Sequence, residues 1–371
     1  MQRQTWIAVS AIVGIVIVAV VGYRLQVQPG KLTTAPIKIG VILPLSGDSA
    51  IIGKTNLDGI ILAAERINAG SGQKVQIVVK DDKMDPKETL SQYRQLKDVK
   101  HVRYIMTVTY GGFLALAKQA EQDGVVLIDS LDASEELAQQ GQNAFAIGIY
   151  DESIGFAIAD YLNQQRVTKV AVISNIRDPF ILLTRNALKS HYQGMMREEN
   201  YNADTNDFRA ILTKLSGYDR IVLLGWEETG RIVKQAREMG LNIKFTGIDT
   251  VASENFRKNA GGKVDGLSFT FWQGSKANPR YRDLLKAYQA KFGKEPENVA
   301  FTAIGYDATG VLAQVLQSCG DDIACTRQAL RTGVKSYEGA TGQITITPDG
   351  ITRSILERMH TYRQGQIVEL K

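Results

Sequence analysis

The stretch Ile37–Asn68, IKIGVILPLSGDSAIIGKTNLDGIILAAERIN, decides the fold class of this chain. Its first residues, Ile37–Leu43, are almost continuously apolar and predict a buried strand. Pro44 and Gly47 end this strand, and a long amphipathic helix follows the loop. Ser46 lies in that loop, at the carboxyl end of the strand, which is where open α/β sheets bind their ligands.

An apolar run, Trp6–Gly22, lies near the start of the chain between Arg3 and Arg24. It is long for the core of a secretory signal peptide and slightly short for a membrane-spanning helix. We favour an uncleaved membrane anchor, with a cleaved signal peptide as the alternative. A buried core helix is disfavoured because the run has no polar face. Residues 1–36 are thus expected to be a signal anchor or signal peptide plus a linker, with the rest periplasmic or extracytoplasmic.

The composition excludes several classes of function. The formal net charge is +5, but several basic residues lie in or beside the apolar run, so the folded part is close to neutral. No basic cluster is interleaved with aromatic residues, so nucleic-acid binding is not expected. The histidines, His101, His191 and His360, are scattered, and two cysteines are too few for a zinc site. We expect neither a metal nor a cofactor.

The two cysteines, Cys319 and Cys325, lie in the segment CGDDIAC. In an oxidising compartment this spacing permits a small disulfide loop, which we favour. Two free thiols are the alternative.

Apolar strands alternate with helical segments along the rest of the chain. A first series has strands at Val75–Asp82, Val102–Val108 and Val125–Ser130. The pattern restarts at Lys169–Asn175, where we expect a following helix that reaches Asn200. Two successive series of this kind predict an α/β protein with two doubly wound lobes.

Five further fragments follow the opening unit in a fixed order: DDKMDPKETLSQYRQL, DGVVLIDS, IVKQAREMGLNIKFTG, YQAKFGKEPENVAFTAIGYDAT and EGATGQITITPDG. Together they resemble the type I periplasmic binding proteins of the leucine/isoleucine/valine-binding-protein-like family, including its amide- and urea-binding relatives. These proteins are solute receptors of ABC importers. The resemblance implies a clamshell of two α/β lobes that hold the ligand in the cleft between them.

The resemblance also implies where the lobes begin and end. Three crossing strands are expected near Ile147–Asp151, Phe269–Gln273 and Gly339–Gln343. Lobe 1 would then consist of residues 37–148 and 273–339, and lobe 2 of residues 149–272 and 340–371.

The ligand contacts of lobe 1 can be placed by the resemblance. Family members offer a serine hydroxyl and neighbouring N–H groups to the ligand carboxylate, and this turn here is Tyr110-Gly111-Gly112. Tyr110 would then supply the hydroxyl, while Gly111 and Gly112 would present N–H groups at a helix start, which suits an anion. Ser46 is a further candidate, although it could be an ordinary turn residue.

The next expected contact segment of lobe 1 is Leu131-Asp132-Ala133. Ala133 lacks the hydroxyl that family members carry there. Asp132 introduces an acid close to the position expected for the ligand carboxylate. These departures argue against a simple branched-chain amino acid as the ligand.

Lobe 2 of the family adds an aromatic residue and an acid. Trp226 corresponds to the aromatic position, with packing at a strand end as the alternative. Asp249 corresponds to the acid that binds the ligand's ammonium group, with a helix cap as the alternative. Phe180 is a further aromatic candidate. A zwitterion held between Asp249 and the first-lobe N–H groups would couple binding to closure of the lobes.

Two enzymatic interpretations compete for the first loop. A P-loop needs four residues between its glycines, whereas five separate Gly47 from Gly53. The tripeptide Gly47-Asp48-Ser49 also resembles the nucleophile motif of extracytoplasmic esterases, for which His360 and Glu357 would have to complete a triad. Both interpretations are disfavoured.

We therefore expect a non-enzymatic receptor that binds an amino acid, an amide or urea, works with an ABC permease and contacts the membrane through its N-terminal run. A membrane-anchored sensor that uses the same clamshell remains the main alternative.

Overall fold

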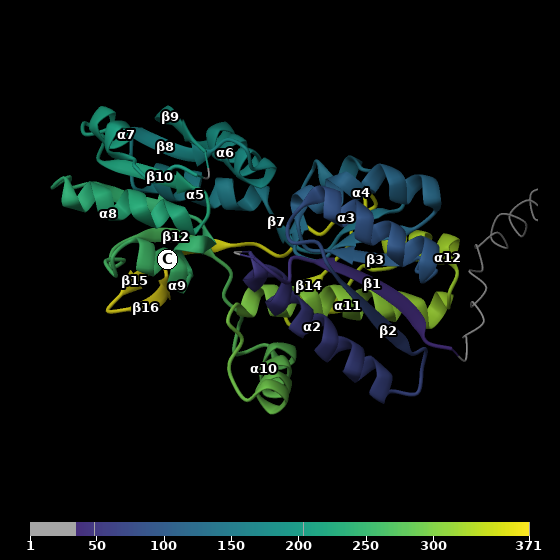
Figure 1. The fold of residues 1–371 in the computed structure, drawn as a ribbon. Coiled ribbons are helices and arrows are strands. Elements are labelled where there is room, and N and C mark those ends of the chain that lie inside the picture. Colours follow the sequence, from purple (N-terminus) through teal and green to yellow (C-terminus); the bar gives the residue numbers. More distant parts are fainter. Residues whose placement is uncertain (1–34, 48, 203, 371) are drawn as a thin grey trace, which may run out of the picture.

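The computed structural model describes residues 35–47, 49–202 and 204–370, which fold around two sheets (Figure 1). The first sheet has the order β2-β1-β3-β4-β6, and all of its strands are parallel. Its strands are β1 (Ile37–Leu43), β2 (Val75–Asp81), β3 (Tyr104–Thr107), β4 (Val126–Asp129) and β6 (Ala144–Ala146). The prediction of an α/β fold with parallel sheets is confirmed.

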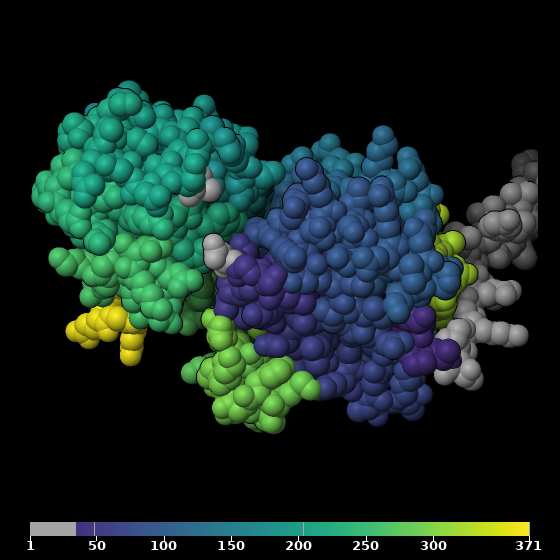
Figure 2. All heavy atoms as spheres, in the orientation of Figure 1, coloured from purple at the N-terminus to yellow at the C-terminus, as the bar shows by residue number. Residues whose placement is uncertain are grey.

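The second sheet has the order β16-β15-β12-β11-β10-β8-β9. Its parallel part consists of β8 (Lys169–Asn175), β9 (Met195–Tyr201), β10 (Arg220–Leu224), β11 (Lys244–Gly247) and β12 (Ser268–Phe271). Two antiparallel strands, β15 (Arg358–Arg363) and β16 (Gln366–Glu369), extend it beyond β12. Figure 2 shows the two halves as two masses that meet at a waist.

Helices cover both faces of each sheet, so both sheets are buried. Lobe 1 is defined as the first sheet together with the helices α2 (Ala50–Ala69), α3 (Pro86–Arg94), α4 (Tyr110–Asp123), α10 (Pro279–Phe292), α11 (Val299–Cys319) and α12 (Ile323–Thr332). Lobe 2 is defined as the second sheet together with the helices α5 (Glu152–Gln164), α6 (Pro179–His191), α7 (Arg209–Lys214), α8 (Gly230–Glu238) and α9 (Glu254–Asn259). Apolar side chains alternate between the two faces of the strands and form separate core clusters there.

The tightest packing in lobe 1 is between α2 and α11. A Cβ atom on Gly59 would lie 2.0 Å from the carbonyl oxygen of Thr302, so only glycine allows this approach. The side-chain amide of Asn56 is buried in the same contact and donates to the carbonyl oxygens of Ser130 (2.8 Å) and Phe301 (3.2 Å). Asn56 thereby ties both helices to the loop that follows β4.

The chain passes between the lobes three times. The first passage includes β7 (Ile149–Tyr150), and the second follows the end of β12. The third runs beside the first, because isolated bridges pair Ile351 with Ala146 and Ile355 with Ile149.

The third passage lies later in the chain than expected. The segment expected there, Gly339–Gln343, instead forms the turn after β13 (Tyr337–Glu338) and the first residue of β14 (Gln343–Ile344). Asp307 on α11 holds this turn in lobe 1, because its carboxylate accepts the N–H groups of Ala340 (2.8 Å) and Thr341 (2.7 Å). Residues 340–351 therefore lie with lobe 1 and not, as expected, with lobe 2.

The helix expected to reach Asn200 is also shorter than predicted. It ends at His191, and Met195–Tyr201 forms β9 at the edge of the second sheet. The side chains of β9 are largely polar and partly exposed, so an apolar pattern could not reveal the strand.

One helix among the described residues, α11, is long and apolar enough to span a membrane. In its most apolar window 83% of the residues are buried, which identifies α11 as the core helix of lobe 1. The apolar run Trp6–Gly22 lies outside the described residues.

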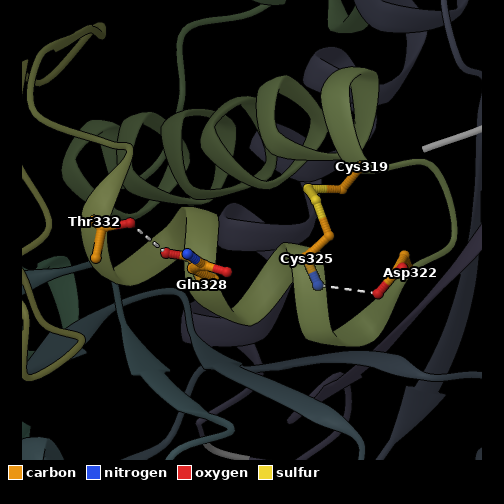
Figure 3. The surroundings of a disulfide bond; sticks show 5 residues. All are labelled: Cys319, Asp322, Cys325, Gln328 and Thr332. Atoms are coloured by element: carbon orange, nitrogen blue, oxygen red, sulfur yellow. Dashed lines mark hydrogen bonds between the residues drawn. A yellow bond between two sulfur atoms is a disulfide. The ribbon is translucent and has the colours of Figure 1, made fainter. Parts of the chain in front are cut away.

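Cys319 and Cys325 form a disulfide that joins the end of α11 to α12 (Figure 3). The Asp322 carboxylate caps α12 by accepting the N–H of Cys325 at 2.9 Å. This loop lies far from the lobe interface, because 18 residues of helix separate Cys319 from Phe301, a distance of about 27 Å.

We expect the double variant Cys319→Ala/Cys325→Ala to lower the free energy of unfolding by about 2 kcal/mol, as estimated for a loop of this length. Ligand affinity should stay unchanged because the bridge is remote. Denaturant unfolding of the oxidised wild type and the variant measures the first effect. Two alkylatable thiols in the native exported protein would contradict the bridge itself.

Candidate ligand-binding site

A cavity of about 350 Å³ lies between the two lobes. The loops that follow the carboxyl ends of seven parallel strands line it: β1, β2, β3 and β4 in lobe 1, and β8, β10 and β11 in lobe 2. This placement follows the general rule for open α/β sheets. Eight of the predicted site residues line this cavity: Tyr110, Gly111, Gly112, Leu131, Asp132, Phe180, Trp226 and Asp249.

Two predicted site residues do not line the cavity. The Ser46 hydroxyl donates to the Asp81 carboxylate at 2.6 Å and so links the loop after β1 to the end of β2. Ala133 is fully buried behind the cavity wall, within β5 (Asp132–Ala133). Ser49 and Ile52, further along the same first loop and helix, occupy the wall instead.

The start of α4 forms one wall in lobe 1. Tyr110 is buried, and its hydroxyl donates to Glu136 at 2.6 Å and lies 3.1 Å from the Ser134 hydroxyl. Burial and the Glu136 carboxylate raise the pKa of Tyr110 above its usual range. This hydroxyl therefore has partners inside the protein, in contrast to the expectation that it faces the ligand. Gly111 leaves open space where a side chain would stand.

An aromatic pair forms the opposite wall in lobe 2. The rings of Phe180 and Trp226 stack with centroids 5.8 Å apart and planes inclined by 20°. The indole N–H of Trp226 donates to the Asp178 carboxylate at 2.7 Å, and the other oxygen of Asp178 caps α6 through the N–H of Phe180. Asp178 thus fixes both rings at the edge of the cavity.

Five carboxylates line the cavity, and the sequence identified only two of them. Asp132 and Asp249 were predicted, whereas Asp178, Asp151 and Glu357 were not. Asp151 lies on the first passage between the lobes, directly after β7, and Glu357 lies on the third passage, directly before β15. The two acids of the segment YDES were a weak signal for Asp151, whereas the segment LERM gave none for Glu357.

Burial raises the pKa values of Asp132, Asp151, Asp249 and Glu357, and nearby acids add to this effect. Burial and the nearby Glu227 raise the pKa of Asp249 to about 7. Burial, then Asp129, Asp178 and Asp249, hold the pKa of Asp132 well above its usual range. Burial and Asp132 do the same for Asp151. The cavity is thus a region where negative charge is concentrated and costly.

The esterase interpretation is not supported by the geometry. Ser49 lines the cavity between the lobes, whereas His360 lines a different cavity near Trp272. His360 lies on β15, and its Nδ1 is 2.8 Å from the carbonyl oxygen of Arg358 on the same strand. Among the described residues, no group of three or more histidine, cysteine, aspartate or glutamate side chains is arranged to hold a metal ion.

The model of the periplasmic binding protein family matches residues 36–363. This chain belongs to the type I periplasmic binding proteins. More narrowly, it belongs to the leucine/isoleucine/valine-binding-protein-like members. This family consists of binding proteins, and membership supports a periplasmic or extracytoplasmic location.

Individual relatives agree with this assignment. This periplasmic binding protein is 28% identical to Leu/Ile/Val-binding protein homolog 3 of Brucella melitensis, covering 91% of this chain and 94% of the relative. It is 24% identical to the leucine-, isoleucine-, valine-, threonine- and alanine-binding protein of Pseudomonas aeruginosa, covering 85% and 86%. The branched-chain amino acid transporter substrate-binding protein of Streptococcus pneumoniae, solved with isoleucine, superposes with a TM-score of 0.81 at 27% identity, covering 90% of this chain and 98% of that one.

The raised pKa values predict how stability depends on pH. The ordinary pKa of Asp249 is 3.8 and its folded pKa is about 7, so folding takes up a proton between these values. The stability that this carboxyl contributes is therefore present at low pH and is lost as the pH rises through about 7. Wild type should be more stable at pH 5.5 than at pH 8, and Asp249→Asn should reduce the difference by on the order of 2 kcal/mol.

Denaturant unfolding at the two pH values measures this difference. Asp160→Asn is the matched control, because Asp160 is exposed on α5 and should leave the difference unchanged. A wild-type difference that survives intact in Asp249→Asn would contradict the assignment.

Proposed function

We propose that this periplasmic binding protein captures a small polar ligand, an amino acid or amide, and delivers it to an ABC importer by hinge closure. The relatives support the ligand class, since they are described as binding proteins for leucine, isoleucine, valine and other amino acids. Neither Tyr110, whose hydroxyl is held by Glu136, nor Ala133 offers a free hydroxyl to a ligand, and this separates the chain from a simple branched-chain binder.

The observation that carries this proposal is a single cavity with walls from both lobes. Asp132 and Tyr110 come from lobe 1, and Trp226 and Asp249 come from lobe 2, while the passages between the lobes contribute Asp151. A ligand that contacts both walls is bound more tightly by the closed arrangement. It therefore shifts an open–closed equilibrium toward closure, with the passages as hinge.

We expect a screen of the full-length protein against amino acids, small amides and urea to find a compound that raises its melting temperature by several degrees. A ligand at 100 times its Kd adds about 2.7 kcal/mol to the free energy of unfolding. Small-angle X-ray scattering should show a decreased radius of gyration with that compound. Stabilisation without any change in the radius would contradict hinge closure, and no stabilisation by any compound would contradict the receptor function.

We also propose that the run Trp6–Gly22 anchors the protein to the outer face of the cytoplasmic membrane. An anchored clamshell suits delivery to a permease, and it equally suits the sensor interpretation. Cell fractionation should place the protein in the membrane fraction, released by detergent and not by salt. Recovery of the folded protein from the cytosol would contradict export.

Cross-linking of the ligand-loaded protein distinguishes delivery from sensing. A cross-link to a permease favours delivery, whereas a cross-link to a sensor kinase favours sensing.

A further inference from the structure

The charge of the cavity wall is strongly one-sided. Five carboxylates line it, on Asp132, Asp151, Asp178, Asp249 and Glu357. Among the described lining residues Arg177 is the one basic side chain, and it is exposed. Like charges this close are unfavourable unless a bound group compensates them.

Asp151 shows most directly that a partner is missing. Its side chain is 1% exposed and lines the cavity, and neither carboxylate oxygen has a hydrogen-bond partner among the described residues. One carboxylate oxygen of Glu357, which is 4% exposed, is likewise unpartnered. Buried polar atoms are nearly always paired in folded proteins, so these oxygens call for a donor from the cavity. A cationic N–H group is the donor that also offsets their charge.

Asp132 occupies the place where a ligand carboxylate would otherwise bind. The start of α4 supplies N–H groups suited to an anion, but Asp132, a carboxyl of the protein itself, lines the cavity there, and the N–H of Tyr110 favours its ionised form. A ligand carboxylate placed beside it would meet a like charge. Binding of an amino-acid carboxylate at the start of α4 is therefore disfavoured in this protein.

The aromatic pair in lobe 2 fits the apolar part of a cation. The stacked rings of Phe180 and Trp226 lie next to Asp178, and Asp249 of the same lobe lines the same cavity. Aromatic faces attract ammonium and guanidinium groups and pack against the methylene groups that carry them. A compound with an apolar stem and one or more cationic ends would satisfy both features.

We propose that the ligand is an organic cation, an amine or guanidinium compound without a free carboxylate, held between Asp132 of lobe 1, Asp249 of lobe 2 and Asp151 between the lobes. This inference rests on the proposed receptor function, keeps its small polar ligand and changes the ligand class from an amino acid to an organic cation. The carboxylates of the two lobes repel each other in the empty cavity. A cation between them removes this repulsion and favours closure.

The cation binds the ionised carboxyls, so its affinity depends on pH. The titratable groups at the cavity are those on the five lining carboxylates and Tyr110, with Asp129 behind Asp132, Glu152 near Asp151, Glu227 near Asp249 and Arg177 at the edge. The pKa of Asp249 is raised to about 7 by burial and by Glu227. Affinity for the cation should therefore increase from pH 6 to pH 8, with release of protons on binding.

Matched compounds test the charge requirement on the full-length protein. Titration calorimetry at pH 7 compares L-leucine with L-leucinamide and L-arginine with L-argininamide, which differ by loss of the carboxylate. The neutral 4-methylpentanamide and the dication 1,4-diaminobutane complete the set. We expect each amino-acid amide to bind at least tenfold more tightly than its parent amino acid, and 4-methylpentanamide to bind much more weakly than L-leucinamide.

Two variants test the named carboxylates. Asp151→Asn and Asp132→Asn should each weaken the tightest-binding cation at least tenfold, while the surface control Asp160→Asn should not. Asp132→Asn should also narrow the preference for L-leucinamide over L-leucine, an effect that a merely structural role would not produce. An unchanged preference in Asp132→Asn overturns the role of Asp132. The compound comparison needs no variant and stands even if a variant does not fold.

The outcomes separate this inference from the receptor function. An amino acid that binds as tightly as its amide, or a neutral or anionic ligand from the wider screen, overturns the cation inference and leaves the receptor function intact. If no compound in either set binds, both proposals are overturned. Affinity for 1,4-diaminobutane, whose amines stay protonated over this range, overturns the cation inference if it falls between pH 6 and pH 8.

Discussion

The parallel arrangement of both sheets is the constraint from which the site follows. Parallel strands all end at the same edge, and in each lobe that edge faces the other lobe, so seven loops meet at one cavity. The packing behind them is rigid. Glycine at position 59 lets α2 approach α11. The side-chain amide of Asn56 donates to the carbonyl oxygens of Ser130, which follows β4, and of Phe301 on α11. Loops on such a frame hold their side chains in place, and some of these side chains, such as Val108 and Leu131, also belong to the core.

The cavity carries an energetic cost that the fold tolerates. Burial and nearby acids destabilise the ionised forms of Asp132, Asp151 and Asp249, so these groups lower the stability of the ligand-free protein when they are ionised. Groups of this kind are typical of functional sites rather than of cores. The large apolar clusters on both faces of the sheets offset the cost, so the cavity is free to be optimised for a ligand.

The sequence predicted the strongly patterned elements well and the weakly patterned ones poorly. Buried parallel strands such as β1 are continuous apolar runs and were found. The edge strand β9 is polar and was taken for the end of a helix. The third passage was misplaced because the turn 339–342 has the glycines expected of a loop, and its attachment to Asp307 depends on a side chain more than 30 residues away.

The sequence alone determined the fold class, the family and eight residues of the cavity wall, because strand ends are local features and parallel sheets bring them to one edge. The direction of each side chain was decided only by the tertiary structure. The Tyr110 hydroxyl donates to Glu136, and the Ser46 hydroxyl donates to Asp81. Asp151 and Glu357 line the cavity from the passages between the lobes. Contacts between residues distant in the chain set these directions, and no local pattern records them.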